Sequence, residues 1–448
     1  MADDKLFAEL PEQRGPERQR GAPRLLTAER RQVVLRAVDL DGLVAEDDAV
    51  RDVWAFVEGL DLRALDAAIE AREGEPGHPA IDPKILMALW LYATLRGVGS
   101  ARALERLCER EIGFQWLCGG VGVNYHTLSD FRVAHGDLLD RLLSESVAAL
   151  CAEGLVSLER LSLDGVRVRA SAGAASFRRR PSLEVCRQQA QQLVHRLKRE
   201  VQDDPAAGER RRQAARMRAA AERLQRVKAA LRTIGSRENE RRRRAGRHRT
   251  EAEQRQAPRA SATDPQARVM KMPDGGFRPA YNGQLIGDPV SNVVVGVGVD
   301  TSGSDHGWVQ PMLRQVKQRY GRAPGELLVD GAFSRAADLE WAARPENGAT
   351  AIFMAPTNTK HGTDPYKPRD RDGPGVAAWR ARMASSAGQA VYKLRGLHER
   401  INADLRRRGL TRFTVRGKAK ARIILLWHAL AHNLMRSLSL RRTALAAR

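Results

Sequence analysis

The sequence predicts an α/β core that is interrupted by a helical insertion and preceded by an all-α domain. Strand-like runs alternate with helical stretches from about residue 156 onward, which is typical of α/β folds. Residues 179–258 interrupt this alternation with helical spacing alone, and residues 36–155 show helical patterns throughout. With 448 residues, 42% of them hydrophobic, the chain is long enough for two or three domains with sizeable cores.

The all-α domain contains a clear first helix over residues 82–97. Asp82 can cap its start, Pro83 fits its first turn, and Gly97 ends it. A second helix is expected from Ser100 onward.

A third helix is expected within SDFRVAHGDLLDRLL, where Thr127 to Asp130 has the spacing of a capping box. The glycine-rich break GGVGVN separates it from the helix before it. Two helices joined in this way suggest a helix-turn-helix-like DNA reader with Arg132 on its second helix. Plain packing of two helices is the alternative.

The α/β core is expected to begin at VSLERLSLDGVRVRAS, whose alternating residues predict a strand with Asp164 near its middle. Further strands are expected at 277–288, 291–300, 326–333 and 350–356. Helices are expected at 306–319, 335–343, 376–408 and 418–440.

The insertion has apolar residues at alternating spacings of three and four, which is the seam of a coiled-coil hairpin. The first set is Leu183, Cys186, Ala190, Leu193 and Leu197. The second set is Met217, Ala220, Leu224, Val227, Leu231 and Ile234. The segment DDPAAG, residues 203–208, is expected to form the turn between the two helices.

Positive charge is concentrated in the same insertion. The chain has 76 Lys and Arg against 54 Asp and Glu, a net charge of +22, and residues 178–250 supply an excess of 15. A protein this basic favours a polyanion such as DNA or RNA, because phosphate contacts release condensed counterions. The run Arg241, Arg242, Arg243 and Arg244 is the densest candidate for phosphate binding. A solvated helix face, and a genome that favours Arg codons, are the alternatives.

The sequence gives no indication of a zinc site, a disulfide framework, a signal peptide or a membrane span. The four cysteines form no CxxC pair, so neither a zinc knuckle nor a disulfide framework is indicated. The first residues lack the apolar core of a signal peptide. The apolar stretch Ile423–Met435 is too short to span a bilayer. We therefore expect a cytoplasmic protein without a membrane partner.

Metal-assisted phosphodiester chemistry needs hard oxygen ligands around divalent cations, usually three carboxylates from separate elements. Asp164 lies in a predicted strand and is a candidate ligand, but an aspartate in such a strand is more often structural or exposed when taken alone. The hypothesis therefore depends on a set of acidic residues.

Several segments of the sequence resemble the DDE transposases of bacterial insertion sequences. The core runs LSLDGVRVRASAG, TDPQARVMKMPDGGFRPAYNGQL, VGVDTSGSDHGWVQPMLRQV and ELLVDGAFS carry this resemblance. The run VYKLRGLHERINADLRRRGLTRF is similar to the family's Tyr-Arg-Glu-Lys signature, and HPAIDPKILMALWLYATLRGVGSARALERL is similar to its helical N-terminal domain. These runs are distributed over residues 78–436 in a single order.

The resemblance implies an RNase H-like catalytic core with a mixed five-stranded sheet in the order 3-2-1-4-5. Strands 1 and 4 are neighbours in that order, which brings Asp164 and Asp330 together. The resemblance places Glu399 on a late helix that packs against the sheet. Asp300 and Asp305 compete for the second position, but Asp300 ends an edge strand away from Asp164.

The signature residues are Tyr392, Arg395, Glu399 and Arg406, whose spacing on one continuous helix would present all four on one face. By resemblance, Glu399 reaches the metal while Tyr392 and the two arginines contact DNA phosphates. The chain departs from the family at three points: Arg406 stands where Lys is usual, His398 where an apolar residue is usual, and Asn402-Ala403 where Phe-Gly often follows.

The function implied is transposition. The protein would bind terminal inverted repeats, hydrolyse a phosphodiester at each end, and join the freed 3′-OH to target DNA. Asp164, Asp330 and Glu399 would hold two Mg²⁺ ions, with Mn²⁺ as a substitute. Double-stranded DNA is the expected partner, and pairing two ends implies at least a homodimer in a nucleoid-associated complex. A nuclease without joining activity and a catalytically decayed repressor are the alternatives.

The domain boundaries expected from these patterns follow the changes of period. Residues 1–35 are polar and expected to be poorly ordered, and residues 36–155 form the helical DNA-binding domain. Residues 156–178 and 259–440 form the catalytic domain, and residues 179–258 form the basic hairpin.

Overall fold

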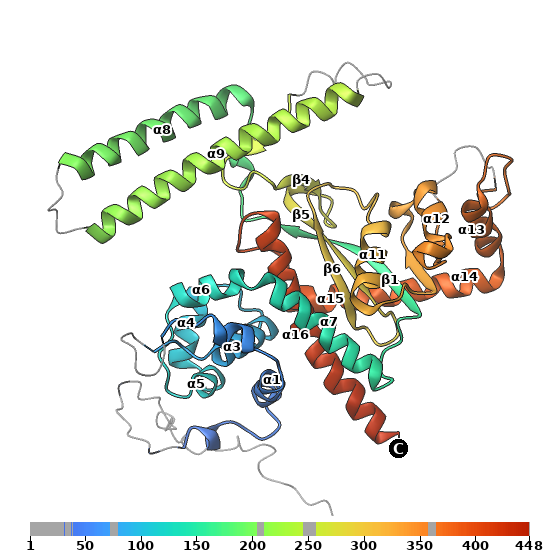
Figure 1. Cartoon of the computed structure of the whole chain (residues 1–448), viewed down its shortest axis with the longest axis horizontal. Coiled ribbons are helices and arrows are strands. Elements are labelled where there is room, and N and C mark those ends of the chain that lie inside the picture. The colour runs from blue at the N-terminus through green and yellow to red at the C-terminus, as the bar shows by residue number, and fades with distance from the viewer. Residues whose placement is uncertain are drawn as a thin grey trace, which may run out of the picture.

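The computed structural model describes residues 31, 37, 39–71, 79–203, 210–244, 257–356 and 364–447. Its elements form a helical N-terminal part, a mixed sheet with helices on both faces, and a long helical hairpin (Figure 1). The predicted α/β class is confirmed. The prediction of a poorly ordered N-terminus falls outside the described residues except at residue 31.

The N-terminal part consists of α1 (Ala49–Glu58), α2 (Arg63–Ala67), α3 (Pro83–Leu95), α4 (Ala101–Arg110), α5 (Ile112–Cys118), α6 (Tyr125–Ala134) and α7 (Gly136–Ala152). α3 begins as predicted, with the Asp82 side chain accepting from Lys84 N and proline in the first turn. Its residues are buried on nearly every side, so α3 is the centre of this part of the chain.

The predicted capping box at Thr127 is wrong. The cap of α6 lies three residues earlier, because the Asn124 side chain accepts from Thr127 N and caps the helix there. The predicted single helix is also divided at His135, so α6 and α7 are separate.

Arg132 is a structural residue, which contradicts its predicted place on a DNA-reading surface. Its side chain is buried, and it donates to Gly99 O at 2.6 Å and to Thr414 Oγ1 at 2.8 Å. Its guanidinium lies 4.6 Å from the centre of the Trp90 ring. Arg132 therefore ties α6 to the C-terminal part of the chain.

The sheet has strands β1 (Arg160–Arg169), β4 (Arg268–Lys271), β5 (Phe277–Gly287), β6 (Val294–Asp300), β7 (Glu326–Val329) and β8 (Ala351–Met354). β1 is central, with β5 antiparallel on one side and β7 parallel on the other. β8 continues the parallel side, and β6 pairs with β5. Without β4, the order β6-β5-β1-β7-β8 is the predicted 3-2-1-4-5.

The sheet has six strands rather than the predicted five. The additional strand β4 pairs with the first half of β5, whereas β6 pairs with its second half. β4 has four residues, which is too few for an alternating pattern to indicate a strand. Its residue Val269 is apolar although it is half-exposed, which weakens the pattern further.

Both faces of the sheet are covered. α11 (Val309–Tyr320), α12 (Ala336–Ala342) and α13 (Pro374–Ala384) share one apolar core with β1, β7 and β8. α15 (His398–Arg407) and α16 (Lys418–Ala446) share the other with β1, β5, β6 and the N-terminal helices. α16 thus lies between the sheet and the N-terminal part, and Asn433 accepts from Val294 N and donates to Val294 O.

The predicted helix over 376–408 is wrong as a single element. α13 ends at Ala384, and Ser385 has an extended backbone and caps α14 (Ser386–Lys393) by accepting from Gly388 N. A 3₁₀ turn, Leu394–Leu397, then separates α14 from α15. It contains Gly396, which favours a break because glycine weakens helix interiors.

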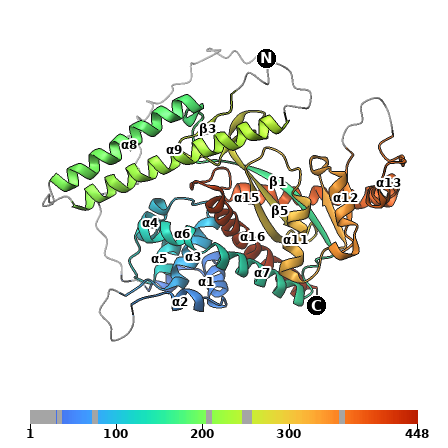
Figure 2. The same cartoon turned by 45° about the horizontal axis from the view of Figure 1, so that its top comes forward.

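The insertion forms two helices, α8 (Arg180–Asp203) and α9 (Arg210–Arg244), which lie side by side and extend away from the sheet (Figures 1 and 2). Leu183, Cys186, Val227 and Ile234 of the predicted seam are buried between them. The expected turn falls almost entirely outside the described residues. Two short strands, β2 (Phe177–Arg178) and β3 (Ala260–Ser261), pair at the base of the hairpin.

Among the described residues, no helix combines the length and the apolar character needed to cross a bilayer.

Three buried histidines predict that the fold loses stability in acid. Burial lowers the pKa of His398 to about 3 and those of His428 and His432 to about 4, so all three fold as neutral rings. The unfolded chain binds protons below about pH 6.5 that the folded chain does not. We expect the free energy of unfolding to fall from pH 6.5 toward pH 4, by up to about 1.4 kcal/mol per pH unit for each ring.

Urea denaturation at pH 7 and pH 5 measures this loss. His432→Gln, which keeps a donor for Asn292 O, should reduce the pH dependence by about one third. His126→Gln, at an exposed position on α6, is the control and should leave it unchanged. Equal pH dependence in all three proteins would contradict the prediction.

Candidate active site

The first candidate carboxylate, Asp164, lies in the middle of the central strand. Successive side chains of β1 point to opposite faces, so Ser162 and Asp164 face α15 while Leu161 and Leu163 face the other core. The Asp164 side chain is largely buried. Its Oδ1 accepts from Gly165 N at 2.9 Å, and its Oδ2 accepts from Asn402 Nδ2 at 2.8 Å.

Asp330 follows the last residue of the neighbouring parallel strand. Leu163 pairs with Val329 on strands about 4.8 Å apart, and Asp164 and Asp330 are the residues that directly follow this pair. Asp330 also caps the following 3₁₀ turn, accepting from Ala332 N. The two acids thus follow paired residues of neighbouring strands, and their action as one site stays a prediction.

Electrostatics supports the same neighbourhood. Burial raises the pKa of Asp164 to about 6, and repulsion from Asp305 and Asp330 adds to this rise. The Gly165 amide and the Arg395 guanidinium act in the opposite direction. Asp164 is thus coupled to two other carboxylates and one cation, which is frequent at catalytic centres.

Asp305, which the sequence offers as a competitor of Asp330, approaches β1 from the opposite face. It accepts from Asn282 Nδ2 at 2.6 Å and from Gln284 Nε2 at 2.7 Å. A Cβ atom at Gly165 would lie 2.4 Å from Asp305 Oδ1, so Asp305 could keep its present position only beside a glycine. Since Gly165 and Asp164 point to opposite faces, the β1 backbone separates Asp305 from the Asp164 side chain.

The other competitor, Asp300, is used locally. It ends β6, an edge strand separated from β1 by β5. Burial alone would raise the pKa of Asp300, but hydrogen bonds from Ser302, Trp308 and the loop backbone together lower it.

Glu399 lies on α15, the helix that contacts β1, but its side chain is 70% exposed. Its Oε1 lies 3.7 Å from Arg395 Nη2. Within the described parts of the chain, no group of three or more His, Cys, Asp or Glu side chains is arranged to hold a metal ion. In these parts of the chain, Asp164 and Asp330 follow paired residues of neighbouring strands, and Glu399 does not form a three-residue group with them.

The signature residues occupy three successive elements rather than one helical face. Tyr392 lies half-buried in the last turn of α14, and Arg395 lies in the 3₁₀ turn. Glu399 and the exposed Arg406 lie on α15. The four predicted phosphate-binding arginines, 241–244, are the last residues of α9.

Two residues that connect α15 to the site were not predicted as functional. Asn402 donates to Asp164, and His398 Nδ1 lies 2.6 Å from Ser162 Oγ. Both stood out in the sequence as departures from the family signature. The i, i+3 spacing of Glu399 and Asn402 was the available signal, because it puts them on neighbouring parts of one helix surface.

The residues around Asp164 fit a hard divalent cation. The groups available are carboxylate and amide oxygens, the ligands that Mg²⁺ prefers. Asn402 Oδ1 is buried without a hydrogen-bond partner among the described residues, so one acceptor next to Asp164 is available to a ligand.

Replacing Asp164 should stabilise the metal-free protein. Because its pKa is raised from 3.8 to about 6, the charged form costs folding free energy above about pH 6, and this cost disappears below pH 3.8. Asp164→Asn should raise the free energy of unfolding by about 1–3 kcal/mol at pH 8, with a smaller gain at pH 5.

Denaturation without divalent metal measures this effect, with Asp300→Asn as the control. Asp300 has a lowered pKa, so its replacement should reduce stability at pH 8. If Asp164→Asn were as destabilising as Asp300→Asn, then Asp164 would be a structural residue.

Comparison with protein families agrees with this arrangement. Residues 38–134 match the family described as "Transposase domain (DUF772)", and residues 256–434 match "Transposase DDE domain". The second match contains Asp330 and Glu399, whereas Asp164 precedes it because the hairpin separates β1 from the other strands. No curated protein and no solved structure matches the chain. The two matches together span more than half of the chain, which belongs to the DDE transposases of insertion sequences.

Proposed function

We propose that the chain cleaves the DNA at the ends of an insertion sequence and joins them to a target with an RNase H-like core. The observation that carries this proposal is the parallel pairing of Leu163 with Val329, because Asp164 and Asp330 directly follow these two paired residues. The strand order and the parallel β1–β7–β8 side support an RNase H-like assignment. The domain boundaries given above, with a coiled-coil hairpin inserted after β1, belong to the same proposal.

Asp164, Asp330 and Glu399 are the residues we assign to two Mg²⁺ ions. Such ions, when bound, activate water and stabilise charge on the attacking and leaving oxygens. Asp164 and Asp330 are preferred over Asp305 because they directly follow the paired residues Leu163 and Val329, whereas Asp305 is held by two amides on the face of β1 opposite to Asp164. Glu399 would have to exchange its contact with Arg395 for the metal.

The protein groups around this set have separate tasks. Asn402 fixes the orientation of the Asp164 carboxylate through its amide hydrogen bond. Burial of Asp164 keeps bulk water from one side of the site. Arg395 and Arg406 supply positive charge for phosphate oxygens, and Tyr392 contacts the DNA beside them. Nucleophilic serine or tyrosine is not required, since water and then the 3′-OH attack phosphorus.

Removing any of the three carboxylates should abolish cleavage. Asp164→Asn, Asp330→Asn and Glu399→Gln should each reduce Mg²⁺-dependent cleavage of transposon ends by about a hundredfold or more, because each removes charge needed in the transition state. Gel assays on labelled end DNA measure this. Asp404→Asn, on the same helix as Glu399 and paired with Arg407, is the control and should retain activity. Full activity of Asp330→Asn or Glu399→Gln would show that the assigned triad is wrong.

Strand transfer distinguishes the transposase from its alternatives. With pre-cleaved ends carrying a free 3′-OH, the protein should produce joined products in a target plasmid, since the same site performs both steps. Cleavage without joining would identify a nuclease. Binding of end DNA without either reaction would identify a decayed, repressor-like protein. Sedimentation of the DNA complex would test the proposed homodimer or larger assembly.

A further inference from the structure

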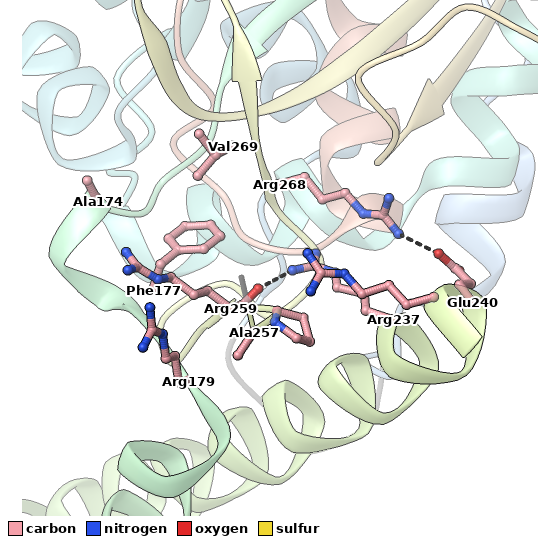
Figure 3. A pocket seen from close by; sticks show the side chains of 11 residues that line it. Ala174, Phe177, Arg179, Arg237, Glu240, Ala257, Arg259, Arg268 and Val269 are labelled. Atoms are coloured by element: carbon pink, nitrogen blue, oxygen red, sulfur yellow. Dashed lines mark hydrogen bonds and ion pairs between the residues drawn. The ribbon is translucent and has the colours of Figure 1, made fainter. Parts of the chain in front are cut away.

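A cleft of about 740 Å³ lies where the helical hairpin meets the sheet (Figure 3). Its charged lining consists of five arginines and one glutamate, namely Arg179, Arg237, Glu240, Arg241, Arg259 and Arg268. These residues come from α9, from β4 and from the two linkers that connect the hairpin to the core. Four separate stretches of chain thus place a net charge of +4 around one space.

The cleft contains little negative charge to balance these arginines. Among the described residues that line it, Glu240 is the one carboxylate, and it lies 3.7 Å from Arg268 Nη2. The dashed lines in Figure 3 show this pair and the hydrogen bond from Arg237 to the Arg259 carbonyl.

Arg237 is the most constrained of the five. Its guanidinium donates to the carbonyl oxygens of Arg259 and Ala267, and its Nε is buried without a partner among the described residues. Burial lowers the pKa of Arg237 to about 10, and repulsion from Arg268 adds to this, so it remains charged at neutral pH. Holding like charges together away from water costs free energy, which a bound anion would offset.

The shape of the lining favours a nucleic-acid backbone over a free anion. Guanidinium groups bind phosphate oxygens through two parallel N–H donors. Beside the arginines, Phe177, Val269 and Ala174 form an apolar part of the wall (Figure 3). A deoxyribose next to the phosphate can pack there, whereas inorganic phosphate would leave this surface uncovered.

We propose that this cleft binds a phosphodiester segment of double-stranded DNA and so fixes the hairpin to the core when DNA is bound. The proposal rests on the proposed function in taking DNA as the ligand, but binding is independent of cleavage. The cleft differs from the catalytic carboxylates and from Arg395 and Arg406, and it uses arginines of four chain segments. Of the predicted arginine run, Arg241 lines the cleft.

Two substitutions at one ion pair test the proposal. Glu240→Gln and Arg268→Gln both remove the Arg268–Glu240 contact, but they change the charge of the cleft in opposite directions. With full-length protein, labelled duplex DNA and no divalent metal, Glu240→Gln should tighten binding about three- to tenfold. Arg268→Gln should weaken it about tenfold and reduce the slope of log K against log salt concentration by about 0.9, the loss of one phosphate contact.

The same helix supplies a matched control pair. Glu222 and Arg226 form an ion pair at 3.3 Å on α9, and Glu222 is about 27 Å along the helix from Glu240. Glu222→Gln and Arg226→Gln change the net charge of the protein by the same amounts, and each should alter DNA affinity by less than about twofold.

Three outcomes would overturn the proposal. If Glu240→Gln and Arg268→Gln both weakened binding, their ion pair would be structural. If the Glu240 and Arg268 substitutions changed DNA affinity no more than the control pair does, the protein would bind DNA through its overall charge and not through this cleft. If inorganic phosphate bound in an Arg268-dependent way while the DNA salt slope stayed unchanged, the cleft would be a site for a free anion. Failure of cleavage with the expected binding changes would instead overturn the enzymatic proposal and leave the cleft assigned.

Discussion

The pairing of β1 on both edges is the constraint on which the rest of the site depends. β5 and β7 hold its backbone from either side, so Asp164 cannot shift without breaking hydrogen bonds of the ladder. The parallel register with β7 then determines where the second carboxylate lies. The alternation along β1 determines which face receives α15. The other two candidate carboxylates are held less firmly than Asp164, because Asp330 follows the end of a strand and Glu399 is largely exposed on its helix.

The contact between β1 and α15 is polar, although both lie in a core of apolar residues. Ser162 meets His398, and Asp164 meets Asn402, each through one hydrogen bond between buried or largely buried side chains. Apolar side chains at these positions would pack at lower cost, because buried polar groups lose their hydration. The polar pairs instead fix one register of helix against strand, since a shift of α15 would leave both pairs unsatisfied. Asp164 is therefore under two opposing requirements: the proposed metal site needs its charged carboxylate, whereas burial of that charge costs folding free energy.

The spacing of apolar residues and the residues that begin or end elements predicted most strands and helices close to their observed bounds, because those signals are local. The helix over 376–408 was predicted wrongly since Ser385 could either continue a helix or cap the next one, and tertiary packing selects the cap. β4 was missed because four residues are too few to show alternation. The pairing of Asp164 with Asp330 could be expected only through the resemblance, which supplied the strand order. Asn402 could not be assigned, because spacing alone does not tell which side of α15 meets the sheet.

The two-residue pairing of β2 with β3 has a consequence for the history of the chain. Phe177 and Arg178 pair with Ser261 and Ala260, and Ser176 Oγ lies 2.7 Å from Ser261 Oγ, so the chain returns to within hydrogen-bonding distance of where it left. An insertion whose ends meet in this way can gain or lose helical turns in both arms without moving β1 or β5, and lengthening adds little closure entropy. The hairpin is thus a module whose reach can evolve separately from the chemistry of the core.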